Sequence, residues 1–482
     1  MEMNKILIPL ATLCCLACST IKPVVSTRVA GVEQGLLTAV VADSAPPTKY
    51  SLAERMRYFS VPGVSIAVFE RGKVAWRRGY GWADAGQQRP VTPETQFQAA
   101  SISKSITAFA VLKLVAQGRL NLDQDANTYL KDWKIPDSEF TRQEKVTVRR
   151  LLGHTAGLQD DGFLGYLKSE TIPSATQVLN GLGHSPRLTV VAVPGSKFAY
   201  SGGGYLVLQK VVEDVSGQPF AEFVQQRVFK PLSMAHSTFG PEPAANASLA
   251  YGRDGQACPG GWRVYPELGP AGLWTTPTDL ATFSLAVQRA AKGEPRAALP
   301  APLAQAMLTP GPGNYGLGMV VRGEGPQRRF FHAGSNPGGY ECLMMNYPER
   351  GVGIVIMTNG SQGGILRDEV LRAFTAEYGI GDSQPQRVAL VALPTAAMTA
   401  YTGRYQFEKM GNYYLDMSLD PDNHLVLLDP NDGKKNVFLP TGADSFIDMS
   451  NGDKAVFTKD PDTGEVTSVL YNGAYVFKKL AQ

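Results

Sequence analysis

The sequence changes its pattern once, near residue 382, and this change constrains the fold more than any other feature. Up to about Gly381, stretches with helical spacing alternate with strand-like runs, as in an α/β or α+β domain. From Tyr401 onward, short strand-like runs alternate with turn residues. The pattern predicts a large mixed domain over residues 49–381, a linker over 382–395, and a small all-β barrel or sandwich over 396–482. A length of 482 residues suits two domains.

Local patterns predict several elements of the mixed domain. Residues 63–69 and 73–80 are strand-like and flank Arg71-Gly72, which favours a hairpin. Residues 103–117 are rich in Ala, Leu, Val and Lys and end at Gly118, a helix stop. These segments predict that both helices and paired strands build the domain.

The first 18 residues predict an export signal. Lys5 supplies a positive start, and residues 6–17 form a short apolar run. The stretch Cys15-Leu16-Ala17-Cys18 resembles a bacterial lipobox, which predicts lipidation at Cys18; an ordinary cleaved signal peptide is the alternative. We therefore expect a periplasmic protein or a lipoprotein tethered to a membrane. Residues 19–48 lack a clear period and predict a tether.

Composition excludes several classes of function. The chain has 46 basic and 43 acidic residues, so no basic field favours nucleic acid as a partner. Its cysteines have no zinc-site spacing, and we expect Cys258 and Cys342 to be free thiols rather than a disulfide. The acidic loops 429–433 and 460–464 lack the sixth-position glycine of an EF-hand. We expect no metal and no cofactor.

The segment Ser101-Ile102-Ser103-Lys104 carries the chemistry. A serine and a lysine three positions apart at the start of a helix share one face. The free N–H groups at a helix N-terminus favour an oxyanion near Ser101. The amine of Lys104 is placed to take the hydroxyl proton. The chain has no Gly-x-Ser-x-Gly, so the nucleophile elbow of α/β-hydrolases is absent.

Two further motifs follow in order: Tyr200-Ser201-Gly202 and His332-Ala333-Gly334. With Ser-x-x-Lys they resemble the three motifs of the serine hydrolases related to class C β-lactamases and penicillin-binding proteins, which include D-amino-acid peptidases and esterases. Residues 151–158, 194–201 and 271–280 resemble flanking segments of the same family. The tail is similar to the lipocalin-like barrel appended to some members.

The resemblance implies an α+β fold, in which an antiparallel sheet is flanked by helices and an all-helical lobe covers the active site. It also implies roles for individual residues. Ser101 would be the acylated nucleophile, and Lys104 and Tyr200 would jointly move its proton. The backbone N–H groups of Ser101 and Ser335 would hold the oxyanion. No cofactor is required for acyl transfer of this kind.

Two departures from the family pattern bear on the substrate. Gly202 stands where the family has an asparagine that contacts the acylamide of the substrate. His332, followed by Gly334, stands where many β-lactamases have a lysine. A histidine with an ordinary pKa of about 6.5 is a weaker and pH-sensitive anchor for a substrate carboxylate. Both departures favour the peptidase and esterase branches.

We therefore expect an exported serine hydrolase acting on peptides, amides or esters, such as D-residue peptides or peptidoglycan-like stems. The alternatives are a carboxylesterase or weak β-lactamase, and a non-catalytic protein that binds penicillin or peptidoglycan. The complete set Ser101, Lys104 and Tyr200 argues against the last. We interpret His154 as a structural hydrogen-bonding residue and Asp279 as a helix cap. The sequence leaves the oligomeric state open.

Overall fold

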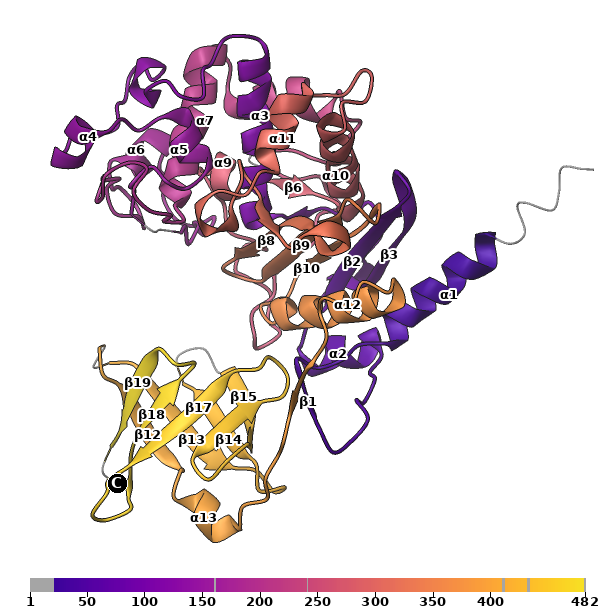
Figure 1. Cartoon of the computed structure of the whole chain (residues 1–482), viewed down its shortest axis with the longest axis vertical. Helices are drawn as coiled ribbons and strands as arrows, with labels where there is room; N and C mark the ends of the chain where they lie inside the picture. The colour runs from indigo at the N-terminus through magenta and orange to yellow at the C-terminus, as the bar shows by residue number, and fades with distance from the viewer. Residues whose placement is uncertain (1–20, 160–161, 241, 410–411, 431–433, 481–482) are drawn as a thin grey trace, which may run out of the picture.

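The computed structural model describes residues 21–159, 162–240, 242–409, 412–430 and 434–480. Figure 1 shows a mixed α and β domain above a separate barrel. The proposed signal peptide and Cys18 lie outside the described residues. Within the described part of the chain, no helix has the length and apolar character needed to span a bilayer.

A seven-stranded antiparallel sheet forms the centre of the mixed domain, in the order β4-β3-β2-β10-β9-β8-β7. Arg71 and Gly72 both have positive φ, 52° and 78°, which gives the tight turn of the predicted β2–β3 hairpin. The strands are β2 (Gly63–Glu70), β3 (Lys73–Asp84), β4 (Arg89–Pro90), β7 (Val320–Arg322), β8 (Arg329–Asn336), β9 (Tyr340–Tyr347) and β10 (Val352–Thr358).

One face of the sheet is covered by α1 (Ile21–Gln34), α2 (Leu52–Tyr58) and α12 (Gly363–Glu377). A capping box between Ser51 and Glu54 starts α2. Under these helices, Arg55 and Glu369 form a bidentate ion pair with N–O distances of 2.6 and 2.7 Å. Both side chains are buried, at 7% and 0% exposure, so this pair locks α2 to α12.

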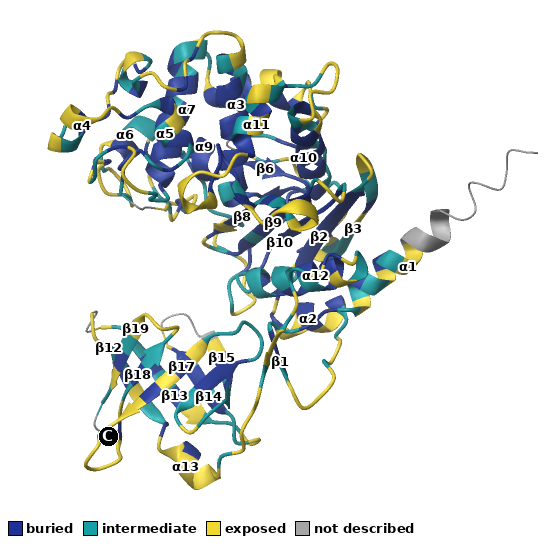
Figure 2. Ribbon diagram, in the orientation of Figure 1, coloured by how far each residue is buried: buried dark blue, intermediate teal, exposed yellow. Residues whose placement is uncertain are grey.

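The opposite face carries the helical lobe, whose interior is the larger core cluster. Eleven of the fourteen residues of α3 are buried, which explains why its sequence is apolar on all sides (Figure 2). The lobe consists of α3 (Ser103–Ala116), α4 (Glu139–Gln143), α5 (Val148–Leu152), α6 (Ala175–Leu179), α7 (Gly202–Ser216), α8 (Phe220–Val224), α9 (Leu268–Ala271), α10 (Pro277–Ala291) and α11 (Ala301–Met307), with the short strands β5 (Phe97–Gln98) and β6 (Trp274–Thr275). The predicted α+β architecture is confirmed.

The tail closes into an eight-stranded antiparallel barrel, preceded by α13 (Thr395–Thr399). Its strands alternate inward apolar and outward polar residues, as the pattern predicted. The sequence has strand-like runs at residues 413–419, 425–428, 436–439, 455–458, 466–470 and 475–477, which agree with six of these strands, and it does not indicate the other two, β12 and β16. The barrel strands are β12 (Gly403–Phe407), β13 (Tyr414–Leu419), β14 (Leu425–Asp429), β15 (Lys434–Pro440), β16 (Ser445–Asp448), β17 (Lys454–Lys459), β18 (Val466–Tyr471) and β19 (Tyr475–Lys479).

The predicted tether over residues 19–48 is wrong for most of its length. Residues 21–42, here called the N-terminal strap, contain α1 and β1 (Val40–Ala42). Helix α1 packs on α12, and β1 pairs in parallel with β11 (Gln386–Val388) inside the linker. The Val40 amide also donates to the carbonyl of Met449 in the barrel domain, at 3.0 Å. The strap therefore joins the two domains instead of trailing from one of them.

The structure also tests the expectations for Asp279 and for the two cysteines of the mixed domain. Helix α10 is capped by Thr276, whose hydroxyl accepts from the Asp279 amide, so Asp279 is not the cap. The Asp279 carboxylate instead accepts from the His236 amide and the Ser237 hydroxyl, both at 2.8 Å. It ties the start of α10 to the preceding loop. Cys258 and Cys342 are free thiols.

Candidate active site

Ser101 and Lys104 lie together where the helical lobe meets the sheet. Ser101 belongs to a 3₁₀ turn, η1 (Ala100–Ile102), that leads directly into α3. Lys104 Nζ lies 3.1 Å from Ser101 Oγ and donates a second hydrogen bond, also 3.1 Å, to the Pro270 carbonyl at the end of α9. Lys104 is buried at 3% exposure, whereas Ser101 is partly exposed. A buried amine thus contacts a hydroxyl that a substrate can reach.

The turn before Ser101 is strained and is fixed by its neighbours. Ala100 has φ = 48°, a left-handed value that a residue with a side chain rarely adopts. The Ser103 hydroxyl donates to the Ala100 carbonyl at 2.5 Å and accepts from the Leu273 amide at 3.0 Å. The Ala99 amide donates to the Leu273 carbonyl at 2.8 Å. These bonds hold Ser101 in place from both sides of the strained residue.

Tyr200 completes the predicted trio. Lys104 Nζ lies 4.9 Å from the centre of the Tyr200 ring. The next residue, Ser201, caps α7 by accepting from the Gly204 amide at 3.2 Å. Gly202 is the buried first residue of α7 and brings no side chain to the site. The structure therefore brings Ser101, Lys104 and Tyr200 together.

His154 lies much closer to the site than the sequence indicated. Its ring centre is 4.3 Å from that of Tyr200, and its Nδ1 accepts from the Ser201 amide at 3.0 Å. Burial, with a smaller effect of Lys104, holds the pKa of His154 well below its usual value, so the ring is neutral. The structural role expected for His154 agrees with this bond, which fixes the backbone next to Tyr200.

His332 differs from the expected carboxylate anchor. Its side chain is buried, its Nε2 accepts from the Tyr315 hydroxyl at 3.0 Å, and its Nδ1 donates to the Ala333 carbonyl at 2.6 Å. Burial, assisted by Lys104, lowers the pKa of His332 to about 3. The ring is therefore neutral at pH 7, and both nitrogens are already engaged. The expectation of a pH-sensitive anchor was wrong because the sequence did not reveal Tyr315 as its partner.

Gly334 and Ser335 lie on the part of β8 that extends beyond its pairing with β7. Here β8 packs against η1, and Gly334 lies so close to Ala99 that a Cβ on Gly334 would fall within 3.0 Å of the Ala99 carbonyl oxygen. The Ser335 side chain is exposed and donates to Glu341 at 2.5 Å, so only its backbone can serve an oxyanion site. The Asn336 side chain anchors the end of this strand through Gln98 Oε1 at 2.8 Å.

Glu267 is a titratable group that the sequence did not single out. It precedes α9, the short helix whose Pro270 carbonyl holds Lys104. Its carboxyl is buried at 1% exposure, and Oε2 has no hydrogen-bond partner among the described residues. Burial raises its pKa to about 7. No local pattern distinguishes such a residue from an ordinary surface glutamate.

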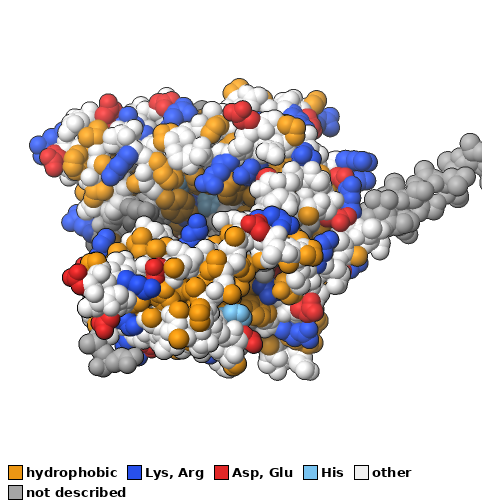
Figure 3. All heavy atoms as spheres, turned by 60° about the horizontal axis from the view of Figure 1, so that its bottom comes forward, with side chains coloured by type: hydrophobic (Ala, Val, Ile, Leu, Met, Phe, Trp, Pro, Cys, Tyr) orange, Lys and Arg blue, Asp and Glu red, His pale blue; other side chains and the backbone are white. Residues whose placement is uncertain are grey.

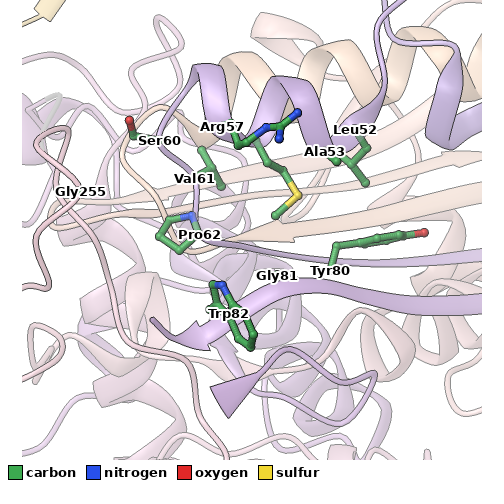
Figure 4. Close-up of a pocket in the computed structure, with 11 residues that line it drawn as sticks. Leu52, Ala53, Arg57, Ser60, Val61, Pro62, Tyr80, Gly81, Trp82 and Gly255 are labelled. Carbon is green, nitrogen blue, oxygen red and sulfur yellow. The ribbon is translucent and has the colours of Figure 1, made fainter. Parts of the chain in front are cut away.

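Other clusters and hollows lie apart from these residues. Within the described residues, one group could offer three metal ligands: Asp420, Asp422 and His424, in the turn between β13 and β14. A surface pocket of about 530 Å³ lies between α2 and β3, and Figure 4 shows Tyr80 and Trp82 on one side and Leu52 on the other. Neither feature includes a residue of the Ser101 site.

Comparison with known proteins settles the family. A model of the beta-lactamase family matches residues 50–376. The chain belongs to the beta-lactamase family. The match spans the mixed domain and ends before the barrel, so the family and fold predicted from the motifs are confirmed.

Individual relatives are more distant. Protein flp of Staphylococcus aureus (strain NCTC 8325 / PS 47) is 29% identical over 180 residues, which is 37% of this chain and 35% of that protein. A D-aminopeptidase of Brucella canis is 25% identical over 332 residues, 68% of this chain and 61% of that protein. The chain thus matches about a third and about three fifths of the lengths of these two relatives.

Solved structures extend the likeness in fold. The octameric penicillin-binding protein homologue from Pyrococcus abyssi has a TM-score of 0.60 and 24% identity, covering 89% of this chain and 98% of that one. The D-amino acid amidase from Ochrobactrum anthropi SV3 has a TM-score of 0.55 and 21% identity, covering 67% and 97%. The first comparison covers 89% of this chain, which is more than the residues 50–376 that match the family model.

Proposed function

We propose that this chain is a serine hydrolase that forms an acyl-enzyme on Ser101. The observation that carries the proposal is the 3.1 Å contact between the buried Lys104 Nζ and Ser101 Oγ. As Ser101 Oγ attacks the substrate carbonyl carbon, Lys104 and Tyr200 take its proton and deliver it to the departing amine or alcohol. Water then attacks the acyl carbon, gives up a proton by the same route, and releases the acid and Ser101.

We propose amides and short peptides of D-amino acids, together with small esters, as the substrate class. A penicillin or a peptide with a free carboxylate is bound most strongly where a cation receives that carboxylate. Here the anchor position holds a neutral, buried His332 with both nitrogens engaged. Gly202 likewise offers no amide group to an acylamide. The names of a sequence relative, a D-aminopeptidase, and of a structural neighbour, a D-amino acid amidase, support the same substrate class.

The test compares release of nitroaniline from D-alanine and L-alanine p-nitroanilides, nitrophenol from an acetate ester, and loss of a penicillin. Each is measured with the wild type, Ser101→Ala, Lys104→Met and Tyr200→Phe, while intact mass reports any adduct. We expect turnover of the D-anilide and the ester, a loss of about 10²–10⁴-fold in kcat for Lys104→Met and Tyr200→Phe, and none with Ser101→Ala. Ester and anilide hydrolysis that survives Ser101→Ala would refute the mechanism.

Outcomes with the penicillin separate the alternatives. Rapid, Ser101-dependent loss of the drug would favour a β-lactamase, whereas a stable Ser101 adduct without turnover of any substrate would favour a penicillin-binding protein. Ester turnover without anilide turnover would favour a carboxylesterase. Each result contradicts the D-amide proposal in a different way.

We also propose that the chain is exported and lipidated at Cys18. The proposal rests on the charged and apolar leader and on the lipobox-like stretch 15–18. Expression with labelled palmitate should yield a labelled, membrane-associated protein, and Cys18→Ala should lose the label. Label that persists in Cys18→Ala would exclude this anchor, and an unprocessed cytosolic chain would exclude export.

A further inference from the structure

A pocket of about 420 Å³ lies behind the active-site strand β8, on the side of the sheet that carries α12. Its floor consists of cross-strand neighbours: Phe331 and Ala333 of β8 lie opposite Met345 and Leu343 of β9. Side chains alternate along a strand, so His332 points to the other face, which carries the Ser101 site. The pocket and the Ser101 site thus share a strand and use opposite faces of it.

Helix α12 and the N-terminal strap form walls of the pocket. Leu371 and Arg372 come from α12, and Ala39 comes from the strap. The linker lies beside the strap here, because the Gln386 amide donates to the Ala39 carbonyl at 2.9 Å. The Arg372 guanidinium donates from Nη1 to the Leu37 carbonyl of the strap at 3.1 Å. Hydrogen bonds therefore fix these walls to each other, and the pocket is preformed.

Arg372 is a cation with no carboxylate of its own. Figure 3 shows basic and acidic side chains mixed over the face that it brings forward, so a charge at the surface does not mark a site. Arg372 instead lines a pocket, and no carboxylate oxygen of a described residue lies within 4.0 Å of its guanidinium nitrogens. Its two acidic neighbours on α12 are engaged elsewhere: Asp368 pairs with Arg367 at 2.9 Å, and Glu369 forms the buried pair under α2. Burial lowers the pKa of Arg372 in spite of both carboxylates. Its positive charge is therefore only partly compensated within the chain.

The other charges of the pocket do not reverse this balance. Among the described lining residues, Arg367, Arg372 and Asp368 carry a formal charge, which leaves one net positive charge. Arg367 also lies 3.7 Å from Glu341, so its own charge is already matched. The pocket therefore presents one guanidinium, that of Arg372, beside an apolar floor.

We propose that this pocket binds a small carboxylate that has an apolar body. A guanidinium presents its N–H groups as a planar fork that matches a carboxylate, and hydrogen bonds between charged partners are the stronger ones. A dianion such as phosphate would exceed the available charge and leave the floor uncovered. The volume lies within the roughly 300–1,000 Å³ of small-molecule pockets. The carboxylate pairs with Arg372, and the apolar body packs on Phe331, Met345 and Leu371. The proposal is independent of the reaction assigned to Ser101.

Binding of three probes of matched shape to the full chain, measured by calorimetry at pH 7, tests the charge of the ligand. The probes are 3-phenylpropanoate, which is anionic, 3-phenylpropan-1-ol, which is neutral, and 3-phenylpropylamine, which is cationic. We expect the carboxylate to bind at least about tenfold more tightly than the alcohol, and the amine to bind more weakly still. Equal binding of the carboxylate and the alcohol, or tighter binding of the amine, would overturn the proposal. An affinity for the carboxylate that falls as the protein concentration rises would show that a second copy fills the pocket, and would overturn it as well.

Variants locate the binding site. Arg372→Gln removes the charge, and Ala333→Glu places a carboxylate on the exposed part of the floor, where folding is least at risk. Each should weaken binding of 3-phenylpropanoate at least about tenfold. Arg387→Gln is the matched control and should bind like the wild type, because Arg387 is an exposed linker arginine that follows Gln386 but does not line the pocket.

Circular dichroism verifies that each variant folds. Unchanged binding in folded Arg372→Gln and Ala333→Glu would place the carboxylate elsewhere, for example at the Ser101 site, and refute the proposal. An equal loss in Arg387→Gln would show a general effect of charge and refute it too.

Discussion

Replacing Gly334 with alanine should disable the site without touching any group that reacts. A Cβ there would lie 3.2 Å from the Ala100 Cβ and closer still to the Ala99 carbonyl, so β8 and the turn holding Ser101 must move apart. Backbone atoms cannot yield as a flexible side chain can, and the new Cβ would lie 2.2 Å from the Ala99 oxygen, where real Cβ atoms stay at least 3.0 Å away, so the displacement is about 1 Å. A misplacement of about 1 Å costs about 10²-fold in rate, or about 2.7 kcal/mol of activation free energy. We expect kcat for ester hydrolysis to fall by this factor.

The assay compares the kcat of Gly334→Ala with that of the control variant Ser335→Ala by steady-state kinetics. The Ser335 side chain is exposed and its backbone N–H is retained in Ser335→Ala, so this variant should keep a kcat close to that of the wild type. Thermal denaturation shows what fraction of each variant is folded, because overpacking also costs about 1–3 kcal/mol of stability. A folded Gly334→Ala with undiminished kcat would refute the close contact between β8 and the Ser101 turn.

Three further perturbations probe other parts of the fold. Burial raises the pKa of Glu267 to about 7, so its protonated form contributes fully to stability below about pH 4.5, and this contribution is lost as the pH rises through 7, at about 1.4 kcal/mol per pH unit. Glu267→Gln should therefore reduce the pH dependence of the free energy of urea unfolding between pH 5 and 7. An unchanged dependence would contradict this. Glu369→Gln leaves the buried Arg55 without its charged partner and should lower the free energy of unfolding by about 3–5 kcal/mol, measured by thermal or urea denaturation. The control Glu349→Gln, at an exposed ion pair, should lower it by less than about 1 kcal/mol. Similar losses in the two variants would contradict the argument. Val40→Pro removes the bond to the Met449 carbonyl and should speed proteolysis of residues 386–388 several-fold, and an unchanged cleavage rate would show that the strap does not protect the linker.

Much of the fold follows from local patterns. The β2–β3 hairpin, helix α3 and six of the barrel strands were predictable because their periodicity and turn residues agree with their burial. Helix α1 was not, because its sequence is weakly patterned and its buried residues Val29 and Val32 are stabilised by packing on α12. Strand β16 has only four residues, so it is too short to stand out before its neighbours are known.

Part of the candidate site could likewise be predicted from the sequence, and part could not. Ser101, Lys104 and Tyr200 could be named from motifs, since each motif fixes a residue type at a spacing. The left-handed Ala100 could not, because the Ser103 hydroxyl that binds its carbonyl is itself held by the Leu273 amide, far along the chain. The neutral state of His332 depends on burial and on Tyr315, and neither is visible in the His-Ala-Gly motif.

The N-terminal strap can complete its packing only late in the synthesis of the chain. Some of its partners, such as Glu70, Arg78 and Tyr50, are made early, whereas α12, residues 386–388 and Met449 are made only when the chain is nearly complete. At about 5–20 residues per second, translation from β1 to β11 takes roughly 20–70 s. During that interval Val29 and Val32, which are buried in the finished protein, lack the part of their cover that α12 provides. The packing of the strap is thus completed only in a chain that has been made as far as the barrel.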